Sequence, residues 1–413
     1  MTPIEGHKFC EFVVGLCVEC YAMFHCGFRS VSQLVSYLDK KLKWGLEGVP
    51  CANTIENWVK KSGYHVYTQE SRSGADQQQD YAAVIDESIM LGNAKTMLVL
   101  GHPAQRSSSE PLKYSDMSVL DMSASPSWNA EKISSLLAQT IQRQGKAPLY
   151  ATSDNDAKLF KALRETSCVQ IRDISHTLAL HVKRLFKDDA DFKALTKKIG
   201  AIKNSDAMRP TRYLLPPRQR TIARFMNLAP TLDWLARMRK AFPSLDAREQ
   251  KSFAFVKQHV RTTAQLEQIF GFITAAETLV KTSGLSKRAI RSLLEMMDAH
   301  LTLNTGKIKR FKNSVRSYLM EESEKLPSEE TVWNASSDII ESFFGVYKSR
   351  RSPDPLVGVT PHILLLPVLT RIEDGKIDFK AALEGVFLKD VKAWGAANLS
   401  ENQAIKRRTT LSA

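Results

Sequence analysis

The first 65 residues carry apolar positions at the spacing of helices rather than strands. In the opening stretch these positions recur three or four residues apart, which places them on one helical face: Phe9, Phe12, Val13, Leu16, Cys17 and Cys20. A second helix is predicted over residues 30–38 and a third over Asn53–Lys61, where Asn53 is suited to cap the first turn and Gly63 to end the last. Residues 1–65 are therefore predicted to form an all-helical module.

Residues 66–80 are polar and aperiodic and indicate a linker, after which the pattern changes to strands. The predicted strands are 81–91, 95–101, 118–124, 148–153 and 169–174, with Gly92-Asn93 as a hairpin turn. Helices are predicted from Asn129 to Gln144 and over 156–165. Three antiparallel strands followed by alternating helices and strands are typical of a ribonuclease-H-like mixed sheet.

Residues 177–330 break this alternation with an almost continuous helical pattern. We expect helices near 178–186, 222–238, 253–260, 264–280 and 287–300. Helix 336–350 then returns to the sheet and another follows near 360–372. The chain is predicted to be mixed α/β, divided as follows: a helical module (1–65), a linker (66–80), a ribonuclease-H-like core in two parts (81–176 and 331–375), a helical insertion (177–330) and a polar C-terminal tail (376–413).

Composition adds a basic character to this picture. The 413 residues are 43% hydrophobic and 25% charged, and 58 Lys and Arg against 44 Asp and Glu give a net charge of +14. This excess favours a polyanionic partner, nucleic acid or an acidic membrane surface. The chain contains no apolar run of about 20 residues that could span a bilayer, and its start lacks the basic region of a signal peptide. With six cysteines in a chain of this size, we expect a cytoplasmic protein without disulfides.

Three acidic residues stand in settings suited to catalysis. Asp86 ends the strand Tyr81-Ala-Ala-Val-Ile-Asp86, Asp154 ends a second strand, and Glu341 lies in the helical run 338–348. Carboxylate oxygens are the ligands that Mg²⁺ prefers, and two such ions can hold the attacking and leaving oxygens of a phosphodiester. Asp156 is a rival to Asp154, but Asp154 directly follows the strand. Taken alone, each residue also fits an ordinary solvated or capping carboxylate.

Basic and amide side chains suggest where DNA could bind. If the N-terminal helices form a helix-turn-helix, the third helix would enter the major groove and present Asn53, Asn57, Lys60 and Lys61. However, residues 39–49 are longer than the tight turn of that motif, so a helical bundle packed on a neighbour remains an alternative. Lys348 lies two turns after Glu341, and with Arg350 and Arg351 it could contact phosphates next to a metal site or form a solvated helix edge.

Several other functions lack support in the sequence. The cysteines and histidines of residues 7–26 crowd one apolar helical run, which favours buried thiols over a four-ligand zinc site. The chain has no Gly-rich loop ending in Gly-Lys-Ser/Thr, no His-Glu-x-x-His and no Gly-x-Ser-x-Gly. An ATPase, a zinc protease and an α/β-hydrolase are therefore not indicated, and no nucleotide cofactor is expected.

The order of three segments resembles a DDE transposase of a bacterial insertion sequence, and more narrowly the Mutator-like and hAT superfamilies. The segments are 151–163, Arg172-Asp-Ile-Ser-His176, and 334–348, which contains Glu341. These superfamilies carry a Cys- or Asp-x-x-His motif soon after the second Asp and a helical insertion before the Glu, and Asp173-Ile-Ser-His176 is similar to that motif. The resemblance covers roughly residues 80–372.

The resemblance implies roles for individual residues. Asp86, Asp154 and Glu341 would bind two Mg²⁺ ions, with Mn²⁺ as a substitute, and Asp173 and His176 would support the site. Trp234 lies in the insertion, where such enzymes stack a Trp on a flipped base, although a Trp between leucines on a helix also fits a core position.

The expected activity is DNA strand cleavage and strand transfer at element ends. A homodimer or higher oligomer on double-stranded DNA is expected, in a nucleoid-associated protein of the cytoplasm. The alternatives are a nuclease without strand transfer and an inactive DNA-binding regulator.

Overall fold

The computed structural model describes residues 2–71, 79–88, 90–106, 109–205, 208–217, 225, 228–354 and 356–412. These residues form two compact units. The first comprises residues 1–105, 112–170 and 337–413, and the second comprises 106–111 and 171–336. Residues 72–78, seven of the fifteen residues of the predicted linker, lie outside the described residues.

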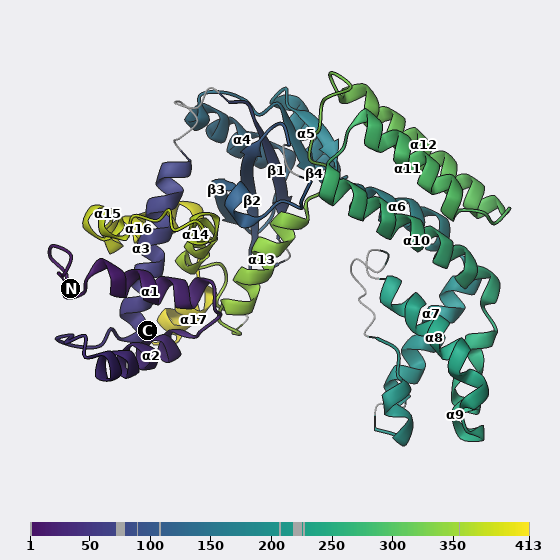
Figure 1. Ribbon diagram of the computed structural model, residues 1–413, viewed down its shortest axis with the longest axis horizontal. Helices are drawn as coiled ribbons and strands as arrows, with labels where there is room; N and C mark the ends of the chain where they lie inside the picture. The colour runs from purple at the N-terminus through teal and green to yellow at the C-terminus, as the bar shows by residue number, and fades with distance from the viewer. Residues whose placement is uncertain are drawn as a thin grey trace. The chain divides into compact units, whose positions relative to one another are not determined.

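A five-stranded mixed sheet forms the centre of the first unit (Figure 1). The strands are β1 Tyr81–Glu87, β2 Lys95–Pro103, β3 Ser118–Ser125, β4 Tyr150–Ser153 and β5 Val169–Arg172, in the order β3-β2-β1-β4-β5. β1 pairs antiparallel with β2 and parallel with β4, and β2 pairs antiparallel with β3. The prediction of a mixed α/β fold is therefore confirmed, and most of the chain is helical.

Successive side chains of β1 point to opposite faces of the sheet, and a different set of helices covers each face. Ala83 and Ile85 pack on the face covered by α4 (Ala130–Gln144) and α5 (Ala157–Glu165). Val84 points to the opposite face, into the core shared with α13 (Asp338–Arg350) and α14 (Leu365–Ile372). The helix predicted from Asn129 is confirmed: the Asn129 side chain caps α4, and Gly145 follows it in the left-handed conformation.

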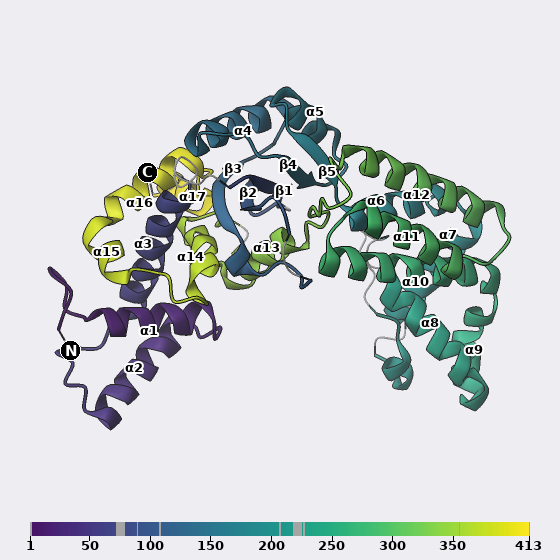
Figure 2. The same ribbon diagram turned by 45° about the horizontal axis from the view of Figure 1, so that its top comes forward.

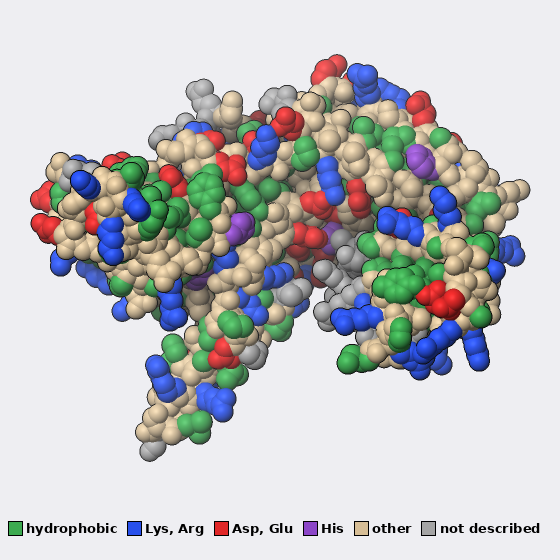
Figure 3. Space-filling view, turned by 60° about the horizontal axis from the view of Figure 1, so that its bottom comes forward, with side chains coloured by type: hydrophobic (Ala, Val, Ile, Leu, Met, Phe, Trp, Pro, Cys, Tyr) green, Lys and Arg blue, Asp and Glu red, His purple; other side chains and the backbone are tan. Residues whose placement is uncertain are grey.

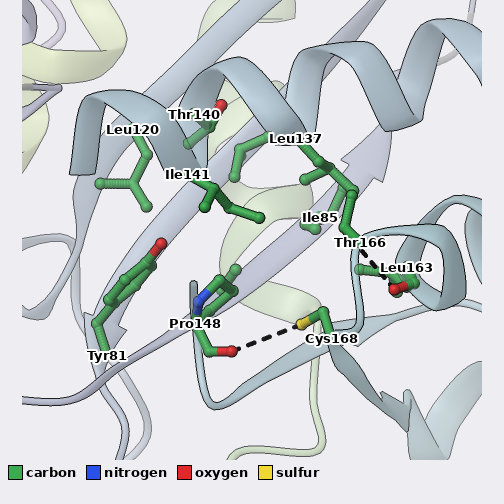
Figure 4. A pocket seen from close by; sticks show the side chains of 12 residues that line it. Tyr81, Ile85, Leu120, Leu137, Thr140, Ile141, Pro148, Leu163, Thr166 and Cys168 are labelled. Carbon is green, nitrogen blue, oxygen red and sulfur yellow. Dashed lines mark hydrogen bonds between the residues drawn. The ribbon is translucent and has the colours of Figure 1, made fainter. Parts of the chain in front are cut away.

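A small cavity lies on the face under α4 and α5 (Figure 4). Its lining is mainly apolar, including Tyr81, Ile85, Leu137 and Cys168, and its volume of about 10 Å³ is close to that of a single water probe. Burial raises the pKa of the Cys168 thiol to about 12, so this cysteine is not a thiolate near neutral pH. The cavity is a packing gap in the core and too small for an organic ligand.

The N-terminal helices share their core with the C-terminal end of the chain (Figure 2). The elements are α1 Glu11–Ala22, α2 Phe28–Leu42, α3 Ala52–Glu70, and, after α14, α15 Phe379–Gly385, α16 Leu388–Asn398 and α17 Gln403–Leu411. α3 packs against α14, α15 and α16. The prediction of a polar tail after residue 375 is wrong, because Phe379, Leu383, Val391 and Trp394 are buried in this core.

The prediction that Gly63 ends the third helix is also wrong. α3 continues through Gly63 to Glu70, and so it includes part of the predicted linker. A Cβ atom at Gly63 would lie 1.8 Å from the carbonyl oxygen of Leu364. Glycine is therefore required by a close backbone contact inside the helix and not by a turn at its end.

The second unit is mainly helical, and it also includes residues 106–111 and the last two residues of β5. Its helices are α6 Ile174–Phe186, α7 Ala190–Ser205, α8 Ala229–Ala241, α9 Ala247–Phe253, α10 Val260–Ser283, α11 Lys287–His300 and α12 Gly306–Lys325. The continuous helix predicted over 253–260 is wrong, because α9 ends at Phe253 and a 3₁₀ turn precedes α10. Residues 222–224, 226 and 227 of another predicted helix lie outside the described residues. No helix in the described part of the chain is long and apolar enough to cross a membrane.

A buried glutamate links three elements of the first unit. The carboxylate of Glu70 accepts hydrogen bonds from the Val119 amide (2.7 Å) and the Thr370 hydroxyl (2.7 Å), and Arg371 Nε lies 2.9 Å away. Burial raises the pKa of Glu70 to about 7, although these three partners oppose the shift. The folded protein therefore binds this proton more tightly than the unfolded chain between pH 4.5 and 7.

Stability should consequently fall as pH rises through this window, by roughly 3 kcal/mol for this one group. Glu70→Gln imitates the protonated form at every pH. It is expected to match the wild type near pH 5 and to be more stable than it at pH 8, as measured by urea unfolding midpoints. The exposed carboxylate of Glu401, replaced by Gln, serves as the control and should leave the wild-type pH profile unchanged. A wild type that gains stability over Glu70→Gln between pH 5 and 8 would contradict the prediction.

Candidate active site

Asp86 lies at the end of β1, on the face of the sheet that carries α13. It follows Val84 by two residues, and side chains two apart share a face. The neighbouring Glu87 belongs to the opposite face, where its carboxylate contacts Lys95 (2.6 Å) and Lys158 (2.7 Å). Asp86 is half-buried, and its Oδ1 accepts a hydrogen bond from the backbone amide of Glu87 (2.8 Å). The pleat of the strand therefore separates two adjacent acids.

Asp154 occupies the matching position after the parallel neighbour of β1. The pairing of β1 with β4 joins Ala83 to Ala151 and Val84 to Thr152. Asp86 and Asp154 each come two residues after the second pair, and parallel strands keep such positions beside each other at the same end of the sheet. The sheet thus brings these two predicted residues to one edge.

The turn after β4 distinguishes Asp154 from its rival Asp156. Asp156 is the N-cap of α5: its Oδ1 accepts the Lys158 amide (2.9 Å), and its Oδ2 lies 3.5 Å from Lys158 Nζ. Asp154 accepts the Asp156 amide (2.9 Å), and its backbone carbonyl accepts a hydrogen bond from the Gln170 side chain (3.0 Å). Asp156 therefore has a local structural role, which favours Asp154 as the residue of the site.

Glu341 enters from the first turn of α13, which packs against β1. It is exposed, whereas Lys348 on the same helix is half-buried, with its ammonium 5.5 Å from the centre of the Phe344 ring. Burial lowers the pKa of Lys348, while the charges of Glu341 and Asp86 act in the opposite direction. One ammonium thus interacts with carboxylates from the strand and from the helix, so Asp86, Glu341 and Lys348 share one neighbourhood.

The donor chemistry of this neighbourhood suits a hard cation, but the side chains do not form a closed cage. Carboxylate oxygens of aspartate and glutamate fit Mg²⁺. Among the residues that the structure describes, however, no three His, Cys, Asp or Glu side chains converge as a metal-binding group. The structure brings Asp86 and Asp154 to one edge of the sheet. The charges of Asp86 and Glu341 both act on Lys348. The three carboxylates do not converge into one metal-binding group.

Asp173 and His176 form a local pair in the second unit. Asp173 is fully buried and caps α6, accepting the His176 amide at 2.6 Å. The Asp173 Oδ1 also lies 3.0 Å from His176 Nδ1, which orients the half-buried imidazole. The amide of Ile174 donates to the Ala335 carbonyl (3.0 Å), which fastens the start of α6 to the end of the unit. The Asp-x-x-His spacing therefore corresponds to a capped first turn.

The side chains predicted to contact DNA on α3 differ in their exposure. Asn53 is exposed and Asn57 is half-buried, and Lys60 forms an ion pair with Glu56 (2.6 Å). Lys61 is buried: its ammonium donates to a backbone carbonyl at 2.7 Å, and burial lowers its pKa. Of these four side chains, only Asn53, at the start of α3, is fully exposed to solvent.

Arg350 is engaged at the end of α1. Its guanidinium donates to the backbone carbonyls of Tyr21 and Ala22 (3.0 Å to Ala22) and lies 4.7 Å from the centre of the Tyr21 ring. Helix carbonyls at this end lack partners within their own helix, so Arg350 completes α1. Arg351 is half-buried and ends α13.

The environments of Trp234 and Gln170 also differ from what the sequence indicated. Trp234 is half-buried, donates from Nε1 to the Leu214 carbonyl (3.0 Å) and lies near the ring of Phe253, as a core residue does. Sequence reasoning missed Gln170, which is buried and also donates to Ser153 Oγ (2.8 Å). A polar residue inside the short strand Val169–Arg172 was the available indication.

Comparison of the chain with protein-family models and with curated proteins found no match.

Proposed function

We propose that this chain is a DNA transposase of the DDE type, with a ribonuclease-H-like catalytic core. The single observation that carries the proposal is the matching register of Asp86 and Asp154 at one end of two parallel strands. The charges of Glu341 and Asp86, which both act on Lys348, support it. A metal-dependent phosphoryl-transfer site requires several carboxylates that can bind the same ions, and aspartates at strand ends with a glutamate on a neighbouring helix can supply them. The proposed catalytic residues are Asp86, Asp154 and Glu341, and Asp173 and His176 are proposed as supporting residues.

The strand order supports the proposed core. An antiparallel β3-β2-β1 meander continued by parallel β4 and by β5 is the arrangement expected of a ribonuclease-H-like sheet. In this reading, the second unit is the insertion between the second Asp and the Glu. The three N-terminal helices are proposed as a helix-turn-helix-like module, with Asn53 and Asn57 at the exposed start of α3 as its contacts.

The chain's own residues supply binding and orientation. Divalent cations bound by the three carboxylates would activate the attacking hydroxyl and stabilise the leaving oxygen. Lys348 would neutralise the carboxylates and contact a phosphate, because the charges of Glu341 and Asp86 both act on its half-buried ammonium. The buried Asp173 holds the His176 ring by a hydrogen bond, which fixes the ring's orientation.

One observation favours a second candidate, an inactive DNA-binding regulator. The described residues contain no ready group of three metal-ligating side chains. A regulator requires only DNA binding, whereas a transposase requires the carboxylates to close around ions when DNA is present.

Incubation of the full chain with candidate element-end DNA separates these functions. Products are read on a denaturing gel with Mg²⁺, with Mn²⁺ and with EDTA. A transposase is expected to nick the ends only with a metal and to join pre-cut ends to target DNA. Nicking without joining would indicate a nuclease, and metal-independent binding without nicking would indicate the regulator.

A further inference from the structure

The positive charge of the chain is concentrated in the second unit. Residues 106–111 and 171–336 contain 31 Lys and Arg against 18 Asp and Glu, out of totals of 58 and 44. The remaining residues contain 27 against 26. Residues 1–70, which include the proposed DNA-reading helices, hold seven of each sign. The electrostatic attraction for a polyanion therefore originates almost entirely outside the N-terminal helices.

Within this unit, four helix ends meet and bring basic residues together. The ammonium of Lys307, at the start of α12, contacts Asp189 between α6 and α7 and lies 4.6 Å from the centre of the Phe186 ring. His259, just before α10, lies 2.5 Å from Asp191 in α7. These contacts join the end of α6 and the starts of α7, α10 and α12 into one junction.

Six exposed cations lie on these four helices near the joined ends, with Lys197 two turns into α7, and we name them the junction patch: Lys183, Arg184, Lys197, Arg261, Lys309 and Arg310. Within the described ranges, none of the six forms an ion pair. The nearby acids are engaged elsewhere, since Asp188 pairs with Lys193 (3.1 Å), Asp189 with Lys307, and Asp191 with His259. Figure 3 shows Lys and Arg side chains spread over the visible face of this unit. The patch thus keeps its charge available to a partner.

Two members of the patch stand where helix electrostatics disfavour them. Arg261 lies in the first turn of α10 and Lys309 closes the first turn of α12, while Arg310 begins the next turn. Neither first turn contains an acidic residue. A cation at the positive end of a helix dipole costs some tenths of a kcal/mol, so these positions do not serve helix stability. An anion bound there would interact favourably with both the side chains and the helix ends.

We propose that the junction patch binds the phosphate backbone of double-stranded DNA and provides most of the chain's affinity for it. Among the described residues of the junction, the exposed large apolar side chain is Val260, so the patch lacks the apolar wedge that a membrane-binding surface requires. The choice of DNA as the polyanion rests on the proposed function.

The test is binding of the full chain to a fluorescent DNA duplex in EDTA, measured by anisotropy over a salt series. Replacing the six patch residues with Gln is expected to weaken binding at least tenfold. It should also lower the slope of log K against log salt concentration by about 3 or more, since each lost phosphate contact removes about 0.9. The smaller set Arg261→Gln, Lys309→Gln and Arg310→Gln should lose about half as much slope. It should unfold no more readily than the wild type, because it removes cations from helix N-termini.

A control with the same net charge is available in the first unit. Gln replaces the exposed Lys40, Lys41, Lys43, Lys406, Arg407 and Arg408. This control should change the slope by less than about 1. Equal losses in both variants, or an unchanged slope in the patch variant, would overturn the proposal, and stronger competition by duplex RNA than by DNA would overturn the choice of DNA. Because the assay contains no metal, its failure is distinct from failure of the catalytic proposal.

Discussion

Replacing Asp86 with Asn is expected to lower the rate of metal-dependent cleavage of element-end DNA about a thousand-fold or more. The substitution keeps the size of the side chain and an oxygen that can accept the amide of Glu87, but it removes the charge. Losing a carboxylate that binds a catalytic ion removes on the order of 4 kcal/mol of transition-state stabilisation. Cleavage is measured as initial nicking rates on a denaturing gel, and duplex binding in EDTA should stay within about threefold of the wild type.

The matched control is the adjacent acid on the other face of β1. Glu87 pairs with Lys95 and Lys158, away from the proposed site, so Glu87→Gln should retain most of the cleavage rate. Asp154→Asn should behave like Asp86→Asn, whereas Asp156→Asn should mainly weaken the cap of α5. Equal losses for Glu87→Gln and Asp86→Asn would indicate damage to the strand, and full activity of Asp86→Asn would remove Asp86 from the site.

The features of the site that could be predicted are those set by local pattern. An apolar run ending in Asp86 and another ending in Asp154 predict strand ends, and the structure places strands there. Residues 169–174 were predicted as a strand, which is wrong at its end, because β5 stops at Arg172 and Asp173 caps the helix that contains His176. Periodicity and capping act within a few residues, so sequence is sufficient for such features.

The features that could not be predicted depend on neighbours distant in sequence. Lys61 was predicted to contact DNA, but it is buried, and its ammonium donates a hydrogen bond to the carbonyl of Leu383, 322 positions later. Arg350 likewise reads as a phosphate contact and instead completes α1. Gly63 was predicted to end a helix. The local sequence does not distinguish such a glycine from one inside a helix that a close backbone contact requires. The C-terminal helices were missed because α15 and α16 are short and bury only a few residues each, and α17 buries none.

Replacing Gly63 with Ala is expected to lower the free energy of unfolding of the first unit by about 3 kcal/mol or more. The new Cβ atom would lie 1.8 Å from the Leu364 carbonyl oxygen and 2.6 Å from its carbonyl carbon. Both are backbone atoms, so no side-chain rotation relieves the overlap, and α3 must move away from the segment before α14. Helix propensity alone favours Ala over Gly by about 1 kcal/mol, which is too little to offset this movement. Urea unfolding midpoints measure the change.

Gly345 provides the control of opposite sign. It lies inside α13 in the same unit, and a Cβ atom there would meet nothing within 4 Å. Gly345→Ala should therefore raise the free energy of unfolding by up to about 1 kcal/mol, through helix propensity alone. A Gly63→Ala protein as stable as Gly345→Ala would show that α3 does not approach Leu364 closely. The packing of α3 against the segment before α14, and with it the shared core of the N- and C-terminal segments, would then be wrong.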